Sequence, residues 1–243
     1  MGSSILHSGT LRVRKRMRKG FSIGGTYVYS KSIDNASSIG GGAAVVAQNF
    51  HDLAAERGLS SFDQRQRFNA DYIYELPLGK EKKWFSKDGW GQRMLGGFSF
   101  SGNVSLASGL PFSPRIFGNS SDINRGVTGS ARPDVVPGAS IQVSDPGIHE
   151  WFNVDAFSKP AGPFGDAGRN IIIGPGTIGF DMSLSRTIQV REMQSLDLRI
   201  SASNVFNHAN FTSIDTTLGS PTFGQVVGVG NMRKAQLTAR YRF

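Results

Sequence analysis

The sequence predicts an all-β fold, an antiparallel transmembrane β-barrel segment, and three observations support this. Apolar and polar residues alternate in segments of about ten residues, the length that a tilted strand needs to cross a bilayer. Long and short connections alternate along the chain. No apolar run is long enough for a membrane-spanning helix. If the protein enters a membrane, it does so with strands.

About seven segments show the alternation. They cover residues 11–18, 21–30, 68–76, 98–106, 180–185, 196–203 and 235–243. In the second segment, Phe21 and Tyr27 share one face, whereas Ser22 and Thr26 share the other. The first segment is the weakest, because Lys15 falls among its apolar positions and would have to extend toward the membrane boundary.

The connections favour a barrel over a soluble β-sandwich, which alternates in the same way and is the commoner fold. The long connections are residues 32–66, 109–176 and 205–231, and the shorter ones between them are 19–20, 77–94 and 191–194. Barrels in the outer membrane have long external loops and short periplasmic turns, whereas a sandwich has no reason to gather every long loop at one end. The long segments are rich in turn residues, so we expect surface loops rather than hidden domains.

Aromatic residues lie near the expected membrane boundaries, where a ring can be half apolar and half hydrated. They are Tyr27 and Tyr29 near one strand end, Tyr72 and Tyr74 near another, and Trp84 and Trp90 in the connection 77–94. The same connection carries Lys80, Glu81, Lys82, Lys83 and Lys87. We expect these charges to be solvated, with a lipid-headgroup contact as the alternative.

Composition excludes several function classes. The chain has no cysteine, which excludes disulfides, thiolate metal sites and cysteine nucleophiles. Its net charge of +9 is compatible with nucleic acid, an anionic lipid surface or arginines in a polar lumen, but no nucleic-acid-binding module is visible. The four histidines, His7, His51, His149 and His208, are scattered over separate loops without metal-ligand spacing.

Glycine-rich and acidic stretches also have ordinary explanations. The stretch GDAGRN, residues 165–170, lacks the strand–loop–helix context of a phosphate cradle, and turns explain its glycines. The aspartates Asp122, Asp145, Asp155 and Asp166 do not form a calcium-binding loop motif. No strained-elbow serine motif of a hydrolase is present. We therefore predict no enzyme activity, no cofactor and no metal site.

The C-terminal stretch resembles the closing strand of outer-membrane barrels. In those proteins alternating apolar residues and a terminal aromatic residue form the signal for the barrel-assembly machinery. The stretch is NMRKAQLTARYRF, residues 231–243, and the matching positions are Leu237, Ala239, Tyr241 and Phe243. The resemblance implies that these four residues are an assembly signal.

Longer stretches resemble the Oar-like TonB-dependent receptors, in which a carboxypeptidase-regulatory-like domain precedes the plug. They are FSIGGTYVYSKSID (21–34), LAAERGLSSFDQRQRFNADYIYELP (53–77), SGLPFSP (108–114), WFNVDAFSKPAGPFGDAGRNIIIGPG (151–176), FDMSLSRTIQV (180–190) and LDLRISASNVFNHANF (196–211). These stretches occur in the order of the family and cover nearly the whole chain.

The resemblance implies a bacterial outer-membrane barrel of about 22 strands with an internal plug, energised through TonB. About seven strands cannot close such a barrel, and an open edge is not tolerated in hydrocarbon, so strands are missing or several copies assemble. We expect residues 1–243 to be the C-terminal portion of the barrel domain, without plug, regulatory-like domain or signal peptide, and not to transport by themselves. The expected partners are outer-membrane lipid, the barrel-assembly machinery and an unknown transported ligand, with TonB acting only through the missing plug.

Charged residues on the polar faces of the strands are candidates for the barrel interior. They could contact plug or solute, or could equally pair with one another across neighbouring strands. The candidates are Asp71, Glu75, Asp181, Asp197, Arg199, Arg240 and Arg242.

Two functions compete with the receptor hypothesis. One is a stand-alone surface or adhesion barrel, in which several copies associate and the longest loop makes contacts outside the cell. The other is a soluble sandwich that acts as a binding module, which would be monodisperse without detergent.

Overall fold

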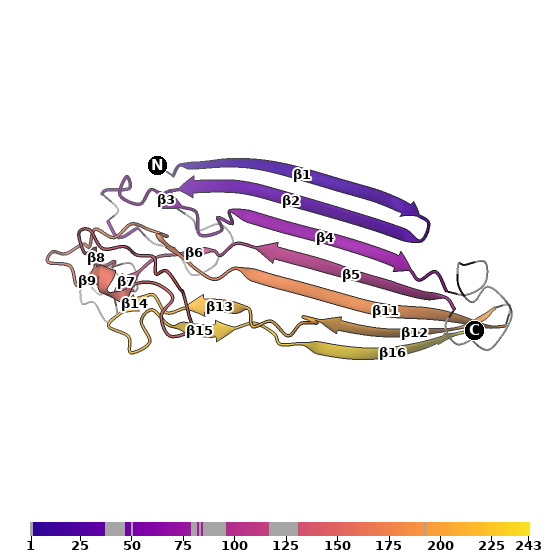
Figure 1. Ribbon diagram of the computed structural model, residues 1–243. Helices are drawn as coiled ribbons and strands as arrows, with labels where there is room; N and C mark the ends of the chain where they lie inside the picture. The colour runs from indigo at the N-terminus through magenta and orange to yellow at the C-terminus, as the bar shows by residue number, and fades with distance from the viewer. Residues whose placement is uncertain are drawn as a thin grey trace.

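The computed structural model describes residues 2–36, 47–49, 51–78, 82, 84, 96–116, 131–191 and 193–243. Its main feature is one antiparallel sheet of long strands, which follow each other in space in their order along the chain (Figure 1). These strands are β1 (Ser4–Arg18), β2 (Phe21–Asp34), β4 (Gln66–Glu75), β5 (Phe98–Ala107), β11 (Thr177–Arg191), β12 (Gln194–Ser203) and β16 (Lys234–Arg242). The sheet confirms the all-β antiparallel fold and each of the seven expected strands.

Several strands begin or end beyond the predicted segments, including β11, which covers Thr177–Arg191 where the pattern marked 180–185. β1 begins at Ser4 rather than at Leu11, so His7 lies in a strand and not in a loop. β2 continues to Asp34, and its last residues contact the long connections, for example where the Ser32 N–H donates to the Asp63 carboxylate at 2.6 Å. A strand that has left the hydrocarbon no longer needs an apolar face, so alternation could not mark these ends.

The described parts of the long connections lie at one end of the sheet, and the hairpin turn between β1 and β2 and the C-terminus lie at the other (Figure 1). We call these the loop end and the turn end. The turn between β1 and β2 has only two residues, Lys19 with φ 53° and Gly20 with φ 78°. Positive φ at both positions gives the tight hairpin whose twist matches its flanking strands. The predicted loop asymmetry is therefore confirmed for the described strands.

The register gives the sheet one apolar and one polar face. One row of directly opposed residues is Leu11, Tyr27, Phe68, Leu106 and Ile178, and the adjacent row on the other face is Arg12, Thr26, Asn69, Ser105 and Gly179. The apolar face is uncovered, as the 63% exposure of Leu11 and the 74% exposure of Leu237 show. Within the described residues the outermost strands, β1 and β16, each pair on one side only, so the sheet is open.

The long connections fold together into what we call the loop cap, at the loop end of the sheet. Short elements hold it: β3 (Gly58–Leu59), β6 (Pro111–Phe112), β7 (Arg115–Ile116), β8 (Asp134–Val135), the 3-10 helix η1 (Val154–Ala156), β9 (Phe157–Ser158), β10 (Ile172–Ile173), β13 (Phe211–Ile214), β14 (Thr217–Leu218) and β15 (Val226–Val229). β3 pairs with the end of β2, and β7 and β14 join two different connections in parallel.

The loop cap also contains the hydrophobic core of the described chain. Its buried members are Phe152, Ala156, Phe157, Ala167, Ile172 and Ile214. Phe152 packs edge-on against Phe157 and against Phe223, with ring centroids 5.7 and 5.2 Å apart, so two long connections share one aromatic cluster. The long connections therefore pack around a common core, which the expectation of surface loops did not include. Turn residues are frequent in these segments, but the apolar residues between them come together only through contacts between distant parts of the chain.

Candidate functional site

The polar face of the sheet carries all the charged residues that the sequence marked as interior candidates. Asp71 is directly opposite Asn103, which is opposite Asp181, and Glu75 lies in the row of Ser99, Ser185 and Arg199. Asp197 is opposite Arg240, and Arg242 is opposite Ser195 in the next row of the same face. Because strands alternate strictly, one sheet face collects them all.

Four of these residues come together near the turn end. The Asp197 carboxylate accepts a hydrogen bond from the Thr187 hydroxyl at 2.7 Å and pairs with the Arg242 guanidinium at 2.8 Å. Arg199 and Arg240 line the same groove, which has a volume of about 310 Å³. Arg186 also lines this groove, so four arginines against one aspartate leave a surplus of positive charge, which suits an anionic group.

A second groove, of about 570 Å³, adjoins the first and shares Arg199 with it. Asp71 and Asp181 line it together with serines, and the hydroxyls of Ser101 and Ser183 lie 2.8 Å apart. Asp181 also accepts the Asn204 N–H at 3.0 Å. Because Arg199 and Lys234 also line it, the second groove carries both signs of charge together with hydroxyls, whereas the first groove is mainly cationic.

Glu75 is separate from these groups. Its carboxylate pairs with Lys82 at 2.9 Å, and both side chains are more than two-fifths exposed. This ion pair supports the expectation that Lys82 belongs to solvated charge. Lys80, Glu81, Lys83, Lys87 and Trp90 lie outside the described residues.

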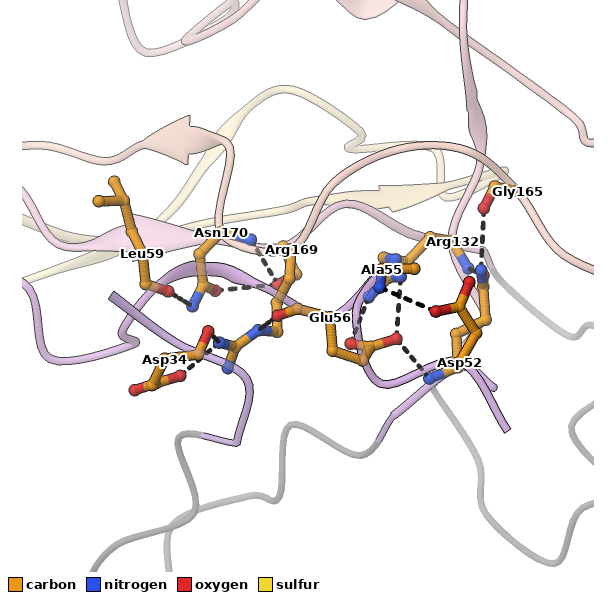
Figure 2. Close-up of polar contacts among 11 residues, drawn as sticks. Asp34, Asp52, Ala55, Glu56, Leu59, Arg132, Gly165, Arg169 and Asn170 are labelled. Atoms are coloured by element: carbon orange, nitrogen blue, oxygen red, sulfur yellow. Dashed lines mark hydrogen bonds and ion pairs between the residues drawn. The ribbon is translucent and has the colours of Figure 1, made fainter. Parts of the chain in front are cut away.

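In the loop cap, a buried ion pair joins two of the long connections (Figure 2). The Arg132 guanidinium donates to both oxygens of Glu56 at 2.8 and 3.0 Å, and Glu56 is only 1% exposed. The Gln48 N–H donates to Glu56 at 2.9 Å, and the Gln48 side-chain oxygen accepts the Arg132 N–H at 2.7 Å. Two parallel bonds between a guanidinium and a carboxylate set geometry as well as energy.

A second buried ion pair, between Arg169 and Asp34, fastens the loop cap to the end of β2 (Figure 2). Arg169 Nε also donates to the Glu56 carbonyl at 2.9 Å, which links the two pairs. The next residue, Asn170, has φ 58° and its side chain donates to the Leu59 carbonyl at 2.6 Å. This buried polar network holds the cap in one arrangement.

From the sequence, turns explained the stretch GDAGRN, residues 165–170. Turns alone do not account for the buried network to which this stretch contributes. Arg169 and Asn170 belong to that stretch and are both 2% exposed. Burial of these two residues was not visible in local spacing, since Asp34 and Arg169 are separated by 135 positions. The available signal was the presence of Glu56 and Arg169 in two of the receptor-like stretches, 53–77 and 151–176.

The loop cap also holds one titrating group with a clear shift. Burial alone would raise the pKa of Asp215, but hydrogen bonds from Ser220, Thr222 and Thr217 outweigh this effect and lower the pKa. The Thr222 hydroxyl donates to the carboxylate at 2.7 Å and the Thr217 N–H at 2.9 Å. Each donor stabilises the ionised form.

The proposed assembly-signal residues lie on the last strand and at the turn end of the sheet. Leu237, Ala239 and Tyr241 are opposite Ile200, Leu198 and Leu196 on the apolar face. The Phe243 ring stacks on Tyr241, with centroids 6.3 Å apart, and it is 95% exposed. Their role as a signal stays a prediction.

Two kinds of feature are absent from the described residues. No group of three or more histidine, cysteine, aspartate or glutamate side chains there could hold a metal ion. No helix in that part of the chain is long and apolar enough to cross a membrane. Asp122 lies outside the described residues.

An antiparallel sheet of consecutive strands, apolar on one face and polar on the other, with long loops at one end, has the architecture of an outer-membrane barrel wall. The comparison with protein families agrees, since the model of the outer membrane beta barrel domain matches residues 1–236. The chain belongs to this family, and its place is the bacterial outer membrane. No curated protein and no solved structure matched the chain.

Proposed function

We propose that the chain forms barrel strands and external loops of a TonB-dependent receptor of the Oar-like type, which takes up a ligand of unknown identity and is not an enzyme. The observation that carries the proposal is the open sheet, because β1 and β16 each pair on one side only within the described residues. Unpaired backbone groups are costly in hydrocarbon, so further strands must complete the wall. Large plugged transporters provide them within one chain.

Two further features support uptake. The described part of the loop cap is packed and ion-paired, which supports a surface that is ordered before a ligand arrives. Preorganised loops lose less conformational entropy on binding. The polar face below the cap offers two adjacent charged grooves along the expected path of a solute, one that combines two aspartates with Arg199 and Lys234 and one that is rich in arginine. TonB would act through a plug domain that these residues do not include.

The competing function is a surface or adhesion barrel in which several copies of the chain close the wall. The same open edges favour it, because β1 of one copy could pair with β16 of another. The two functions differ in where the missing strands come from.

Two experiments separate them. The first is to sequence the genomic DNA on both sides of the coding region; we expect further strands and a plug domain in the same reading frame. A promoter and an authentic start at Met1 would contradict the receptor proposal. The second uses the absence of native cysteine: with Val13→Cys on β1 and Leu237→Cys on β16, disulfide-linked multimers in the outer membrane would support association of copies. We expect only monomers.

A further inference from the structure

The apolar face of the sheet contains cationic side chains near the turn end. On β1, Lys15 is opposite Ile23, and after a register shift Arg18 is opposite Phe21, so both cations share the face of these apolar residues. Lys15 Nζ lies 5.0 Å from the centroid of the Phe21 ring. Lys15, which interrupts the alternation of apolar residues, therefore makes a defined contact with the Phe21 ring near the end of the strand.

A third cation occupies an equivalent place on β11. The alternation continues past the predicted segment 180–185 to Arg186, which the register places directly opposite Phe98 on one side and Leu198 on the other. Arg186 Cζ lies 5.2 Å from the centroid of the Phe98 ring. Phe21 and Phe98 are each the first residue of a strand that begins at the turn end. A cation over an aromatic ring therefore occurs twice near the turn end of the sheet.

The carboxylates of the long strands lie on the opposite face. These strands contain Asp34, Asp71, Glu75, Asp181 and Asp197, and the register places all of them on the polar face. Charge on a surface that contacts hydrocarbon is costly unless the side chain extends to the interface and meets an opposite charge there. The nearby aromatic faces offset only part of this cost.

Lipid can supply the opposite charge. Short turns of outer-membrane barrels face the periplasm, so the turn end lies at the inner leaflet. A long basic side chain there can reach the phosphate of a phospholipid, and basic patches on membrane proteins bind anionic headgroups in this way. Lys15 lies three residues before the end of β1 at Arg18, about 7 Å of height for a tilted strand, most of which an extended lysine can span.

We propose that the turn end of the apolar face binds anionic phospholipid of the inner leaflet, with Lys15 and Arg18 as the contacts to phosphate. The inference rests on the outer-membrane barrel and does not depend on ligand transport or on TonB. It would hold equally for a receptor and for a surface barrel.

The test is lipid binding by the intact native protein in phosphatidylethanolamine nanodiscs, to which phosphatidylglycerol is added, with bound lipid identified by native mass spectrometry. We expect Lys15→Gln to weaken phosphatidylglycerol binding about fivefold, the effect of one basic residue near an anionic surface. The matched control is Arg14→Gln, which removes the same charge from the neighbouring position on the opposite face, where Arg14 is opposite Gly24, and should leave binding unchanged. Heat-modifiable gel mobility verifies that each variant is folded.

The proposal fails if Lys15→Gln and Arg14→Gln bind phosphatidylglycerol equally, or if the wild type shows no preference for it. In nanodiscs that contain lipid A in place of phosphatidylglycerol, weaker binding of lipid A by Lys15→Gln would also overturn the assignment to the inner leaflet. If Lys15→Gln does not assemble, Arg18→Gln provides the same test, because Arg18 is exposed at the last position of β1 and should tolerate substitution. We expect the same weakening for it.

Discussion

The buried ion pair between Glu56 and Arg132 is expected to control the order of the loop cap. Glu56→Gln keeps the shape of the side chain but removes its charge, and it leaves Arg132, which is 5% exposed, as an uncompensated buried cation. Removal of one partner of a buried ion pair costs about 3–5 kcal/mol. The effect should be local, since the sheet is held by its own ladder of hydrogen bonds.

Hydrogen exchange measures this cost directly. The amide of Gln48 donates to Glu56, so its exchange reports on opening of the cap. A loss of about 3–5 kcal/mol corresponds to exchange faster by at least about 10²-fold. Glu75→Gln is the control, because the Glu75–Lys82 pair has a similar 2.9 Å distance but is exposed, and such pairs contribute about 0–1 kcal/mol.

A second substitution tests the reason for the effect. If the cost comes from an unpaired buried charge, Glu56→Gln combined with Arg132→Met should recover much of the lost protection. The reasoning would be refuted if Glu56→Gln and Glu75→Gln changed exchange by similar factors.

Three other predictions test the membrane face, the cap core and one carboxylate. Val104→Arg on the apolar face should destabilise the assembled barrel by about 2–4 kcal/mol near the midplane, whereas Ser101→Arg on the polar face should have a mild effect. Denaturant titration in lipid vesicles measures both free energies of unfolding, and equal effects would contradict the face assignment. Phe152→Ala, at a position only 2% exposed, should cost about 3–5 kcal/mol and make the cap sensitive to limited proteolysis; unchanged cleavage would show that the aromatic cluster is dispensable. Because the pKa of Asp215 is lowered, its stabilising contribution is complete above the ordinary aspartate pKa and is lost as the pH falls through the lowered value; Asp215→Asn should remove this acid dependence from cap protection measured by hydrogen exchange, and an unaltered profile would assign it to another group.

The positions of the strands and the faces of their residues could largely be predicted from the sequence, because both follow from the residue pattern within each segment. A strand that separates lipid from a polar interior must alternate at every second residue, so β4, β5 and β12 could be located from the pattern alone. The same pattern predicts that Asp71 and Arg199 share the polar face, and the register of the sheet confirms it.

Alternation ended where the requirement for an apolar face ended. The first residues of β1 and the last residues of β2 lie outside the segments that the alternation marked and were missed, as expected of strand ends that need no apolar face. Lys15 was visible as an exception to the pattern, but its contact with Phe21 depends on the register between β1 and β2.

The sequence by itself determined the class of the protein. Each strand that crosses a bilayer needs one apolar and one polar face, so each strand separately shows the alternation of residues. Only the tertiary structure decided the form of the loop cap. One buried network joins Asp34, Glu56, Arg132 and Arg169, although up to 135 positions separate them. The connections that carry these residues need no regular alternation, so no sequence pattern indicated the network. The partners of these charges are set by how two long connections pack against each other and against the end of β2, which is information that no single segment contains.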